Sequence, residues 1–213
     1  MQSVNSRSST KTLHIALSAC AVLTAIAGCA TTTTSTSNSR IEIQEQVGFT
    51  ITEKARVSDG TRGDYDQALL LLEQGRTEEG IVMLERVADA TPNLSAPRID
   101  LGIAFAGNAD LEAAEKHLLI ALESNPEHPI AHNELGIVYR KSGRFAAARK
   151  HYEAALAIYP EFHYARRNLA VLCDLYLVDL QCALENYEAY IAIAPDDKET
   201  RMWVADIRSR VAD

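Results

Sequence analysis

From residue 92 onward, a proline returns at almost equal intervals along the chain. Pro92, Pro126, Pro160 and Pro195 are 34, 34 and 35 residues apart, and each follows an apolar stretch with helical periodicity. Proline lacks an amide hydrogen and stops a helix, so each of these residues marks the end of a structural unit. A period of this length is typical of small helical units that stack side by side and bury a face against each other.

Superposing the chain on itself at this period places similar residues in the same columns. The pair Leu101-Gly102 matches Leu135-Gly136 and Leu169-Ala170. Further matching columns contain Phe105 and Tyr139, Ala114 and Ala148, Leu118 and Tyr152, and Ala121 and Ala155. Each unit is therefore expected to contain two helices, which approach closely where Gly102 and Gly136 oppose Ala114 and Ala148.

These columns resemble the tetratricopeptide repeat, whose pattern has Leu-Gly, an aromatic residue, a small residue, an aromatic residue or leucine, alanine and proline in the same order. The resemblance covers residues 61–197. It implies an all-α, right-handed solenoid of about four helical hairpins, more than the roughly three repeats that a solenoid needs for stability.

The last repeat departs from the pattern, as terminal repeats often do. Cys173 stands in its aromatic column, and one extra residue enters near Val178–Gln181. Residues 198–213 follow with an amphipathic pattern, which predicts a capping helix. Its side chains expected against the last repeat are Met202, Trp203 and Ile207.

The first 28 residues have the pattern of an export signal. Arg7 and Lys11 precede an almost uncharged apolar run from Leu13 to Ala27. That run has the length of a signal-peptide core and is shorter than the roughly 20 residues that a membrane-spanning helix needs. Residues 1–28 are therefore predicted to be a signal peptide.

The apolar run ends in Ile26-Ala27-Gly28-Cys29. This sequence resembles the lipobox of bacterial lipoproteins, which implies cleavage before Cys29 and acylation of its thiol. Ala30 stands where aspartate would imply retention in the inner membrane, so the resemblance favours the outer membrane, with the protein facing the periplasm. The alternative is an ordinary secretory signal, or an uncleaved anchor, with an incidental cysteine.

Charge restricts the partners of the processed chain. Of the 21 basic and 29 acidic residues, the leader contains two basic and no acidic ones, so 19 basic and 29 acidic residues remain. Such a surface repels nucleic acid and anionic headgroups. Attachment to a membrane is therefore expected through acyl chains alone.

Residues 29–60 connect the acylated cysteine to the repeats. The stretch Ala30–Arg40 is rich in serine and threonine, which predicts a flexible tether. Residues 41–57 alternate apolar and polar side chains, which predicts short extended segments lying against the helical body.

The chain lacks the sequence motifs of phosphate loops, nucleophile elbows and zinc sites. His128 and His132 are four residues apart, but Pro129 lies between them and places His128 in a turn. No metal, cofactor or catalytic residue is predicted. His128 and His132 are expected to be polar surface residues, and His117, His151 and His163 to occupy exposed repeat positions.

Cys173 and Cys182 lie near the end of one predicted helix and the start of its antiparallel partner. In an oxidising compartment this pair is a candidate disulfide. The alternative is a pair of small core residues, because free cysteine packs as a small hydrophobe.

The resemblance also implies a concave groove lined by the first helix of each hairpin, where a protein partner binds. The groove residues that it implies are Ile99, Ile103, Ile130, Asn133, Ile137, Arg140, Lys141, Tyr164, Arg167, Val171 and Leu175. An apolar floor with basic residues predicts a partner segment with aliphatic anchors and one or two carboxylates. Alternatively, the aliphatic residues pack between repeats, or residues 41–57 or the last helix cover them. Isoleucine at positions 99, 103 and 137 argues against recognition of a chaperone's acidic C-terminus.

The predicted function is that of a non-enzymatic scaffold in an envelope complex. Short repeat lipoproteins of this kind serve pilus or secretin assembly. The segments Gly48–Thr52 and Asp174–Leu177 also look like repeat proteins named as components of TonB-type systems. The alternatives are a self-associating structural lipoprotein and a small enzyme built on an α-solenoid.

Overall fold

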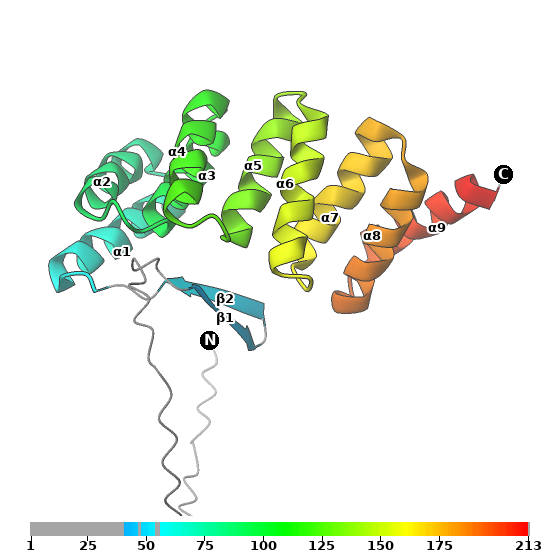
Figure 1. Cartoon of the computed structure of the whole chain (residues 1–213), viewed down its shortest axis with the longest axis horizontal. Helices are drawn as coiled ribbons and strands as arrows, with labels where there is room; N and C mark the ends of the chain where they lie inside the picture. The colour runs from blue at the N-terminus through cyan, green and yellow to red at the C-terminus, as the bar shows by residue number, and fades with distance from the viewer. Residues whose placement is uncertain (1–40, 47, 54–55, 213) are drawn as a thin grey trace, which may run out of the picture. The chain divides into compact units, whose positions relative to one another are not determined.

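A computed structural model describes residues 41–46, 48–53 and 56–212, which all lie within one compact unit (Figure 1). The predicted signal peptide, Cys29 and the tether lie outside the described residues. In the described part, the helices are α1 (Asp59–Glu73), α2 (Thr77–Ala90), α3 (Ala96–Gly107), α4 (Leu111–Ser124), α5 (Pro129–Lys141), α6 (Phe145–Ile158), α7 (His163–Leu172), α8 (Leu180–Ile193) and α9 (Lys198–Ala212). None of the helices described is long and apolar enough to cross a bilayer.

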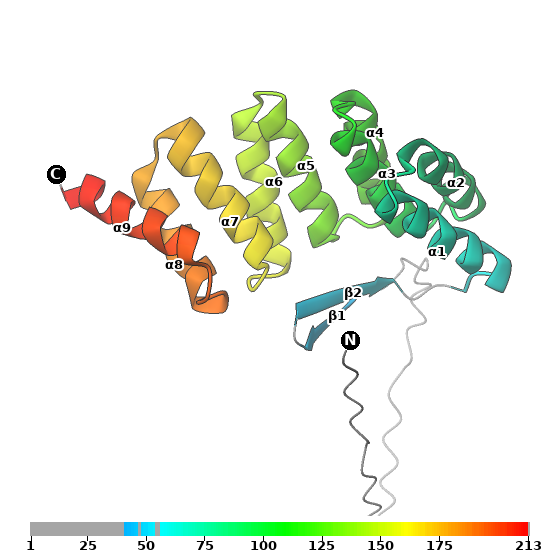
Figure 2. The ribbon, with the colours of Figure 1, turned by 180° about the vertical axis from the view of Figure 1, so that it is seen from behind.

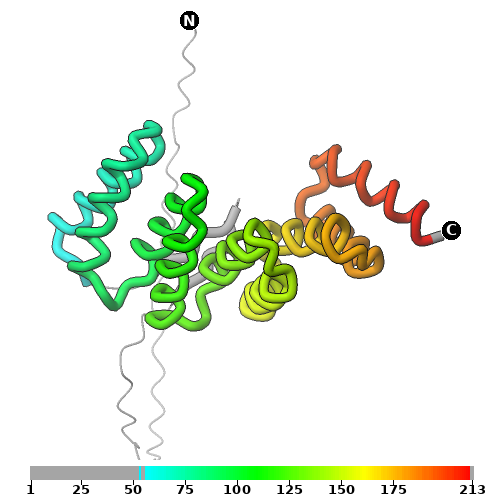
Figure 3. The backbone as a smooth tube through the Cα atoms, turned by 90° about the horizontal axis from the view of Figure 1, so that it is seen from above, coloured from blue at the N-terminus to red at the C-terminus, as the bar shows by residue number. Residues whose placement is uncertain are grey.

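The helices pair as α1–α2, α3–α4, α5–α6 and α7–α8, and α9 packs on α8 (Figures 1 and 2). The predicted fold of four hairpins and a capping helix is therefore confirmed. Helix α3 also contacts α5, and α5 contacts α7, while the second helices of the described hairpins share no comparable contact. Seen from above, the hairpins follow a curve (Figure 3). The first helices α1, α3, α5 and α7 therefore line its inner side, and we call them the inner helices.

Each hairpin turns at the same place in its repeat. The residues with positive φ are Gly75, Ala109, Gly143 and Val178, again 34, 34 and 35 residues apart. The extra residue of the last repeat is taken up by a π-helical turn, η1 (Cys173–Leu177), and Val178 follows as its C-cap. A β-branched residue in the left-handed region is strained, so this turn is held by its surroundings.

The two helices of a hairpin meet at glycine. A Cβ atom on Gly102 would lie 2.5 Å from Cγ of Leu118, and one on Gly136 would lie 2.5 Å from Cδ1 of Tyr152. These large side chains, and not the predicted Ala114 and Ala148, are the nearest atoms to the two glycines. The partner lies one helical turn further along the second helix than expected.

The capping helix covers the last repeat with Trp203 and Ile207, as predicted, but not with Met202. Val204 and Ile207 are buried, and so is Thr200 one turn before. Trp203 is half-buried against the ring of Tyr187, but Met202 is 66% exposed. The expectation for Met202 is wrong, because the Met202 side chain projects from the side of the helix opposite the buried residues.

A β-hairpin precedes the helices where sequence alternation predicts extended segments. Strands β1 (Ile41–Gln46) and β2 (Gly48–Glu53) are antiparallel, with Ile43 opposite Ile51. The carboxylate of Glu53 accepts hydrogen bonds of 2.9 Å from the backbone amides of Ser95 and Ala96, where α3 begins. An acid at a helix N-terminus satisfies free amides and the helix dipole, so this contact fixes the end of the hairpin to the helical body.

Candidate partner-binding groove

Two adjacent positions of the inner helices recur through the repeats, and together they join one repeat to the next. Row A consists of Tyr65, Ile99, Asn133 and Arg167, which are 34 residues apart. Row B consists of Asp66, Asp100, Glu134 and Asn168, at the same spacing, and Trp203 in α9 continues it.

In the described structure, a row A residue of one repeat contacts the row B residue of the next. The Tyr65 hydroxyl donates to the carboxylate of Asp100. The side-chain amide of Asn168 donates to Oδ1 of Asn133 at 2.9 Å. The guanidinium of Arg167 lies 5.1 Å from the centre of the Trp203 ring. Rows A and B are therefore joined by a polar or cation–π contact between α1 and α3, between α5 and α7, and between α7 and the capping helix α9.

The remaining junction, between α3 and α5, is different. Its row A residue is Ile99, which has no polar atom to offer to Glu134. The Glu134 carboxylate is half-buried and accepts a hydrogen bond of 2.9 Å from the neighbouring Asn133 amide. A carboxylate has about four acceptor positions, so this bond leaves most of its capacity unused. Burial raises the pKa of Glu134.

The residues predicted to line the groove fall into three classes of exposure. Ile99 and Asn133 are buried and support the inner surface from beneath. Half-buried residues are Ile130, Ile137, Arg140, Arg167 and Val171, and exposed ones are Ile103, Lys141, Tyr164 and Leu175. Ile103, Ile137 and Val171 occupy one repeat position, so an accessible aliphatic row crosses α3, α5 and α7.

The basic residues of the predicted groove already have partners within the protein. Arg140 donates from Nε to the Tyr152 hydroxyl at 3.4 Å, and its guanidinium lies 5.8 Å from the centre of the Tyr176 ring. The ammonium of Lys141 donates to the backbone oxygen of Ala106 at 3.2 Å.

Arg167 has looser contacts, and in the described structure its buried Nε atom has no hydrogen-bond partner. It lies over Trp203, and its nitrogens are 3.9 Å from carboxylate oxygens of Asp197 and Glu199. Arg140 and Arg167 are therefore partly packed within the solenoid, whereas Lys141 is exposed. Whether these residues bind a partner stays a prediction.

The acids of row B are not among the residues that the sequence predicts to line the groove. Asp66 is exposed, whereas Asp100 and Glu134 are half-buried. Burial raises the pKa of Asp100 as it does that of Glu134. The 34-residue spacing of Asp66, Asp100 and Glu134 is visible in the sequence and predicts that they occupy one repeat position.

A cavity of about 350 Å³ lies at the first end of the inner surface. Arg62, Tyr65 and Asp66 of α1 line one part of it, and Glu53 lines another. The remainder is mostly apolar and includes Val87 and Leu94. The inner surface therefore continues as a recess beside the point where the β-hairpin is attached.

The histidines are mostly structural. His117 is buried and stacks on Phe105, and His128 is buried at the N-terminus of α5. The expected surface location is therefore wrong for both. His132 and His151 are partly buried with Nδ1 atoms 3.0 Å apart. Burial lowers the pKa of His151 to about 4, and the charge of the nearby His132 is the second largest cause of this shift.

These histidines occupy a repeated contact between the two helices of a hairpin. Arg98 lies beside His117, His132 beside His151, and Arg166 beside Asn186, at equivalent repeat positions. His163 is partly buried at the start of α7, 4.0 Å from the Tyr164 ring between centroids. Solvent-exposed positions were expected for His151 and His163, but tertiary packing covers part of each ring.

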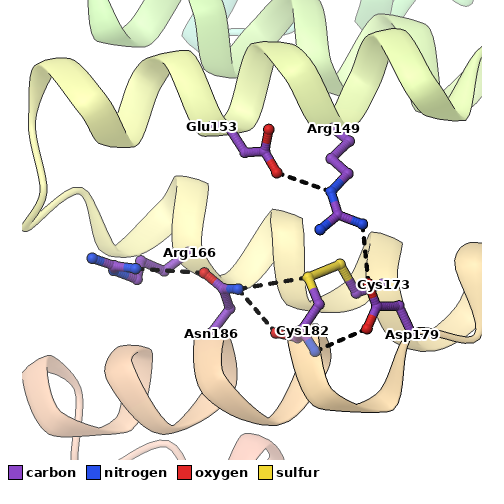
Figure 4. Close-up of a disulfide and its surroundings, with 7 residues drawn as sticks. All are labelled: Arg149, Glu153, Arg166, Cys173, Asp179, Cys182 and Asn186. Atoms are coloured by element: carbon purple, nitrogen blue, oxygen red, sulfur yellow. Dashed lines mark hydrogen bonds and ion pairs between the residues drawn. A yellow bond between two sulfur atoms is a disulfide. The ribbon is translucent and has the colours of Figure 1, made fainter.

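Cys173 and Cys182 are joined by a disulfide at the end of the last hairpin, with Cα atoms 5.9 Å apart (Figure 4). Asp179 caps α8 by accepting from the Cys182 amide, and it also pairs with Arg149 of α6 at 3.0 Å. The side chains of Cys173, Asp179 and Cys182 are close enough to hold a metal ion. As long as the two sulfurs are bonded to each other, they are not thiolate ligands.

The tetratricopeptide repeat model matches residues 99–161 and 134–198. Residues 99–198 are tetratricopeptide repeats. With the hairpin stacking described above, the fold is a right-handed tetratricopeptide solenoid. No curated protein sequence is significantly similar to the chain.

Solved tetratricopeptide structures have the same fold. PilF of Pseudomonas aeruginosa is 19% identical, with a TM-score of 0.66 over 72% of this chain and 70% of that chain. MamA of Desulfovibrio magneticus RS-1 is 22% identical, with a TM-score of 0.64 over 74% and 89% of the two chains. The first repeat domain of Spaghetti (RPAP3), bound to the HSP90 peptide SRMEEVD, is 16% identical, with a TM-score of 0.54 over 57% and 98%. These similarities show the fold alone.

Proposed function

We propose that the protein is a non-catalytic adaptor that holds a segment of a partner protein against its inner helices. Tetratricopeptide repeats generally mediate protein–protein interactions. The observation that carries the proposal is the accessible aliphatic row of Ile103, Ile137 and Val171, because it crosses three successive inner helices and presents apolar surface to solvent. Tyr164 and Leu175, which are 57% and 66% exposed, extend this surface on α7 and η1.

We further propose that the adaptor works in a bacterial envelope complex, such as a pilus, secretin or TonB-type system, and is anchored by an acylated Cys29. The lipobox-like sequence Ile26–Cys29 supports the anchor. The disulfide supports an oxidising compartment, since structural disulfides persist there and not in a reducing cytosol.

A photo-crosslinking amino acid at Ile137 tests the partner-binding surface. In intact cells, we expect it to trap one defined protein, because Ile137 lies in the middle of the aliphatic row. Leu119 is the matched control, since it is an equally aliphatic residue, 41% exposed, on the second helix α4. The same crosslinks from both positions, or no crosslink from Ile137, would count against the groove.

Replacing Cys29 by serine tests the anchor. Mass spectrometry of the unaltered protein should find a mature chain that begins at Cys29 and carries acyl groups, and cell fractionation should place it with membranes. The Cys29→Ser protein should be unacylated and leave the membrane fraction, while a Cys20→Ser control should behave as the unaltered protein does. An unacylated residue 29 behind an intact leader would refute the anchor.

A further inference from the structure

The inner surface carries a row of acidic residues, and its basic residues make contacts within the protein. Row B places Asp66, Asp100 and Glu134 at equivalent positions of three successive inner helices. By contrast, Arg140 and Lys141 are engaged by Tyr152, Tyr176 and a backbone oxygen. These partners are neutral, so they orient the two cations within the protein and leave their charges in place. An incoming segment also meets the three carboxylates of row B on the same surface.

The acids of row B differ in the hydrogen bonds that they accept. The Asp100 carboxylate accepts a hydrogen bond from the hydroxyl of Tyr65, which belongs to the preceding repeat. Glu134 has Ile99 at the equivalent place, so its bond from Asn133 is not matched by one from the preceding helix. Lys141 lowers the pKa of Glu134 through its charge, but this is the smallest influence on that pKa. Glu134 is thus a half-desolvated carboxylate with free acceptor positions, beside the aliphatic row.

We propose that Glu134 receives a lysine or arginine side chain of the partner, so that the groove selects a basic segment with aliphatic anchors. The proposal rests on the adaptor function above and specifies its ligand. The partner's cation would supply the contact between rows A and B that is missing at the α3–α5 junction, where Lys141 bonds only to a backbone oxygen. Ile103 and Ile137, one on each side of that junction, would hold the neighbouring apolar side chains.

The same arrangement disfavours an acidic ligand. A carboxylate placed over α3 and α5 would face Asp100 and Glu134, and like charges at low solvent exposure repel strongly. The expectation of carboxylates in the partner is therefore replaced by one of ammonium or guanidinium groups. The HSP90 peptide SRMEEVD, which is bound by the repeat domain of Spaghetti, contains three acidic residues and serves as a negative probe.

Basic and acidic peptide probes test the preference. A labelled nine-residue peptide of three Lys-Ile-Gly units is titrated by fluorescence anisotropy against the full-length chain, beside three Glu-Ile-Gly units and SRMEEVD. We expect the lysine peptide to bind at least about ten-fold more tightly than either acidic peptide. Glu134→Gln should weaken its binding by about ten-fold, since it removes the charge and keeps the shape.

The matched control is Glu123→Gln, which removes the same charge from an exposed position of α4. It should leave binding of the lysine peptide nearly unchanged, which separates a local contact from attraction by the net charge of −8. Glu134→Gln should not lower the melting temperature, because burial raises the Glu134 pKa and so its ionised form already opposes folding near neutral pH.

An acidic peptide that binds as tightly as the lysine peptide would overturn the basic preference. Equal losses of affinity for the lysine peptide in Glu134→Gln and Glu123→Gln would overturn it as well. If no probe binds while Ile137 still crosslinks a partner in cells, the basic preference is overturned and the adaptor function stands. If Ile137 traps nothing but the lysine peptide binds through Glu134, the site is supported and the cellular adaptor function is not.

Discussion

Replacing Gly136 by alanine is expected to lower the free energy of unfolding by about 2–3 kcal/mol. Alanine normally favours a helix interior by about 1 kcal/mol over glycine, so the sign of the effect is opposite to that of helix propensity. The reason is that the added methyl group would lie 2.5 Å from Cδ1 and 2.9 Å from Cζ of Tyr152. Both distances are well inside van der Waals contact.

The Tyr152 ring has nowhere to move. It is fully buried, and its hydroxyl accepts a hydrogen bond from Arg140. Helices α5 and α6 must therefore move apart, and this movement also disturbs the packing of α5 against α3 and α7. Thermal melts monitored by circular dichroism should show a loss of about 5–10 °C.

Gly63 supplies the matched control, because it lies inside α1 with no atom within 4 Å of the position that a Cβ would take. Gly63→Ala should raise stability by about 0.5–1 kcal/mol. If Gly136→Ala were as stable as the unaltered protein, the close approach of α5 and α6 would be refuted.

The hairpin stacking was predictable because the repeat period is visible in the sequence. Proline and Leu-Gly columns at 34-residue spacing define both helices of a unit and the place where they meet. The partner of each glycine was less predictable. Ala114 and Leu118 are both buried on one face of α4, one turn apart, and only the relative shift of the two helices decides which of them lies over Gly102.

The candidate groove was predictable in position and not in charge. Ile103, Ile137 and Val171 lie on the inner helices, where the repeat resemblance implies the groove, and each is at least partly exposed. The pairing of Arg167 with Trp203 joins residues 36 positions apart through the capping helix, and no local pattern indicates it. A cation in the sequence therefore implies an available charge only after its tertiary partners are known. The histidines illustrate the same limit, since His117 is buried by an aromatic ring from the preceding helix.

Reduction of the Cys173–Cys182 disulfide is expected to lower the free energy of unfolding by about 2–3 kcal/mol, as the chain-entropy model gives for a loop of roughly ten residues. The cross-link restricts the unfolded chain, and it also closes the turn that contains η1 and the left-handed Val178. Without it, that strained turn depends on the pairing of Asp179 with Arg149, which is partly exposed to solvent and therefore weak.

The loss should be local as well as global. The turn exposes Leu175, Tyr176 and Val178 and offers sites for chymotrypsin. We therefore expect dithiothreitol to accelerate cleavage within residues 174–181 and to lower the melting temperature. The double variant Cys173→Ala, Cys182→Ala is the control, since it should melt at the reduced protein's temperature and be insensitive to reductant. Free thiols at Cys173 and Cys182 in the unreduced protein, or a turn that is cut equally fast with and without reductant, would contradict the role of the disulfide in holding this end of the solenoid.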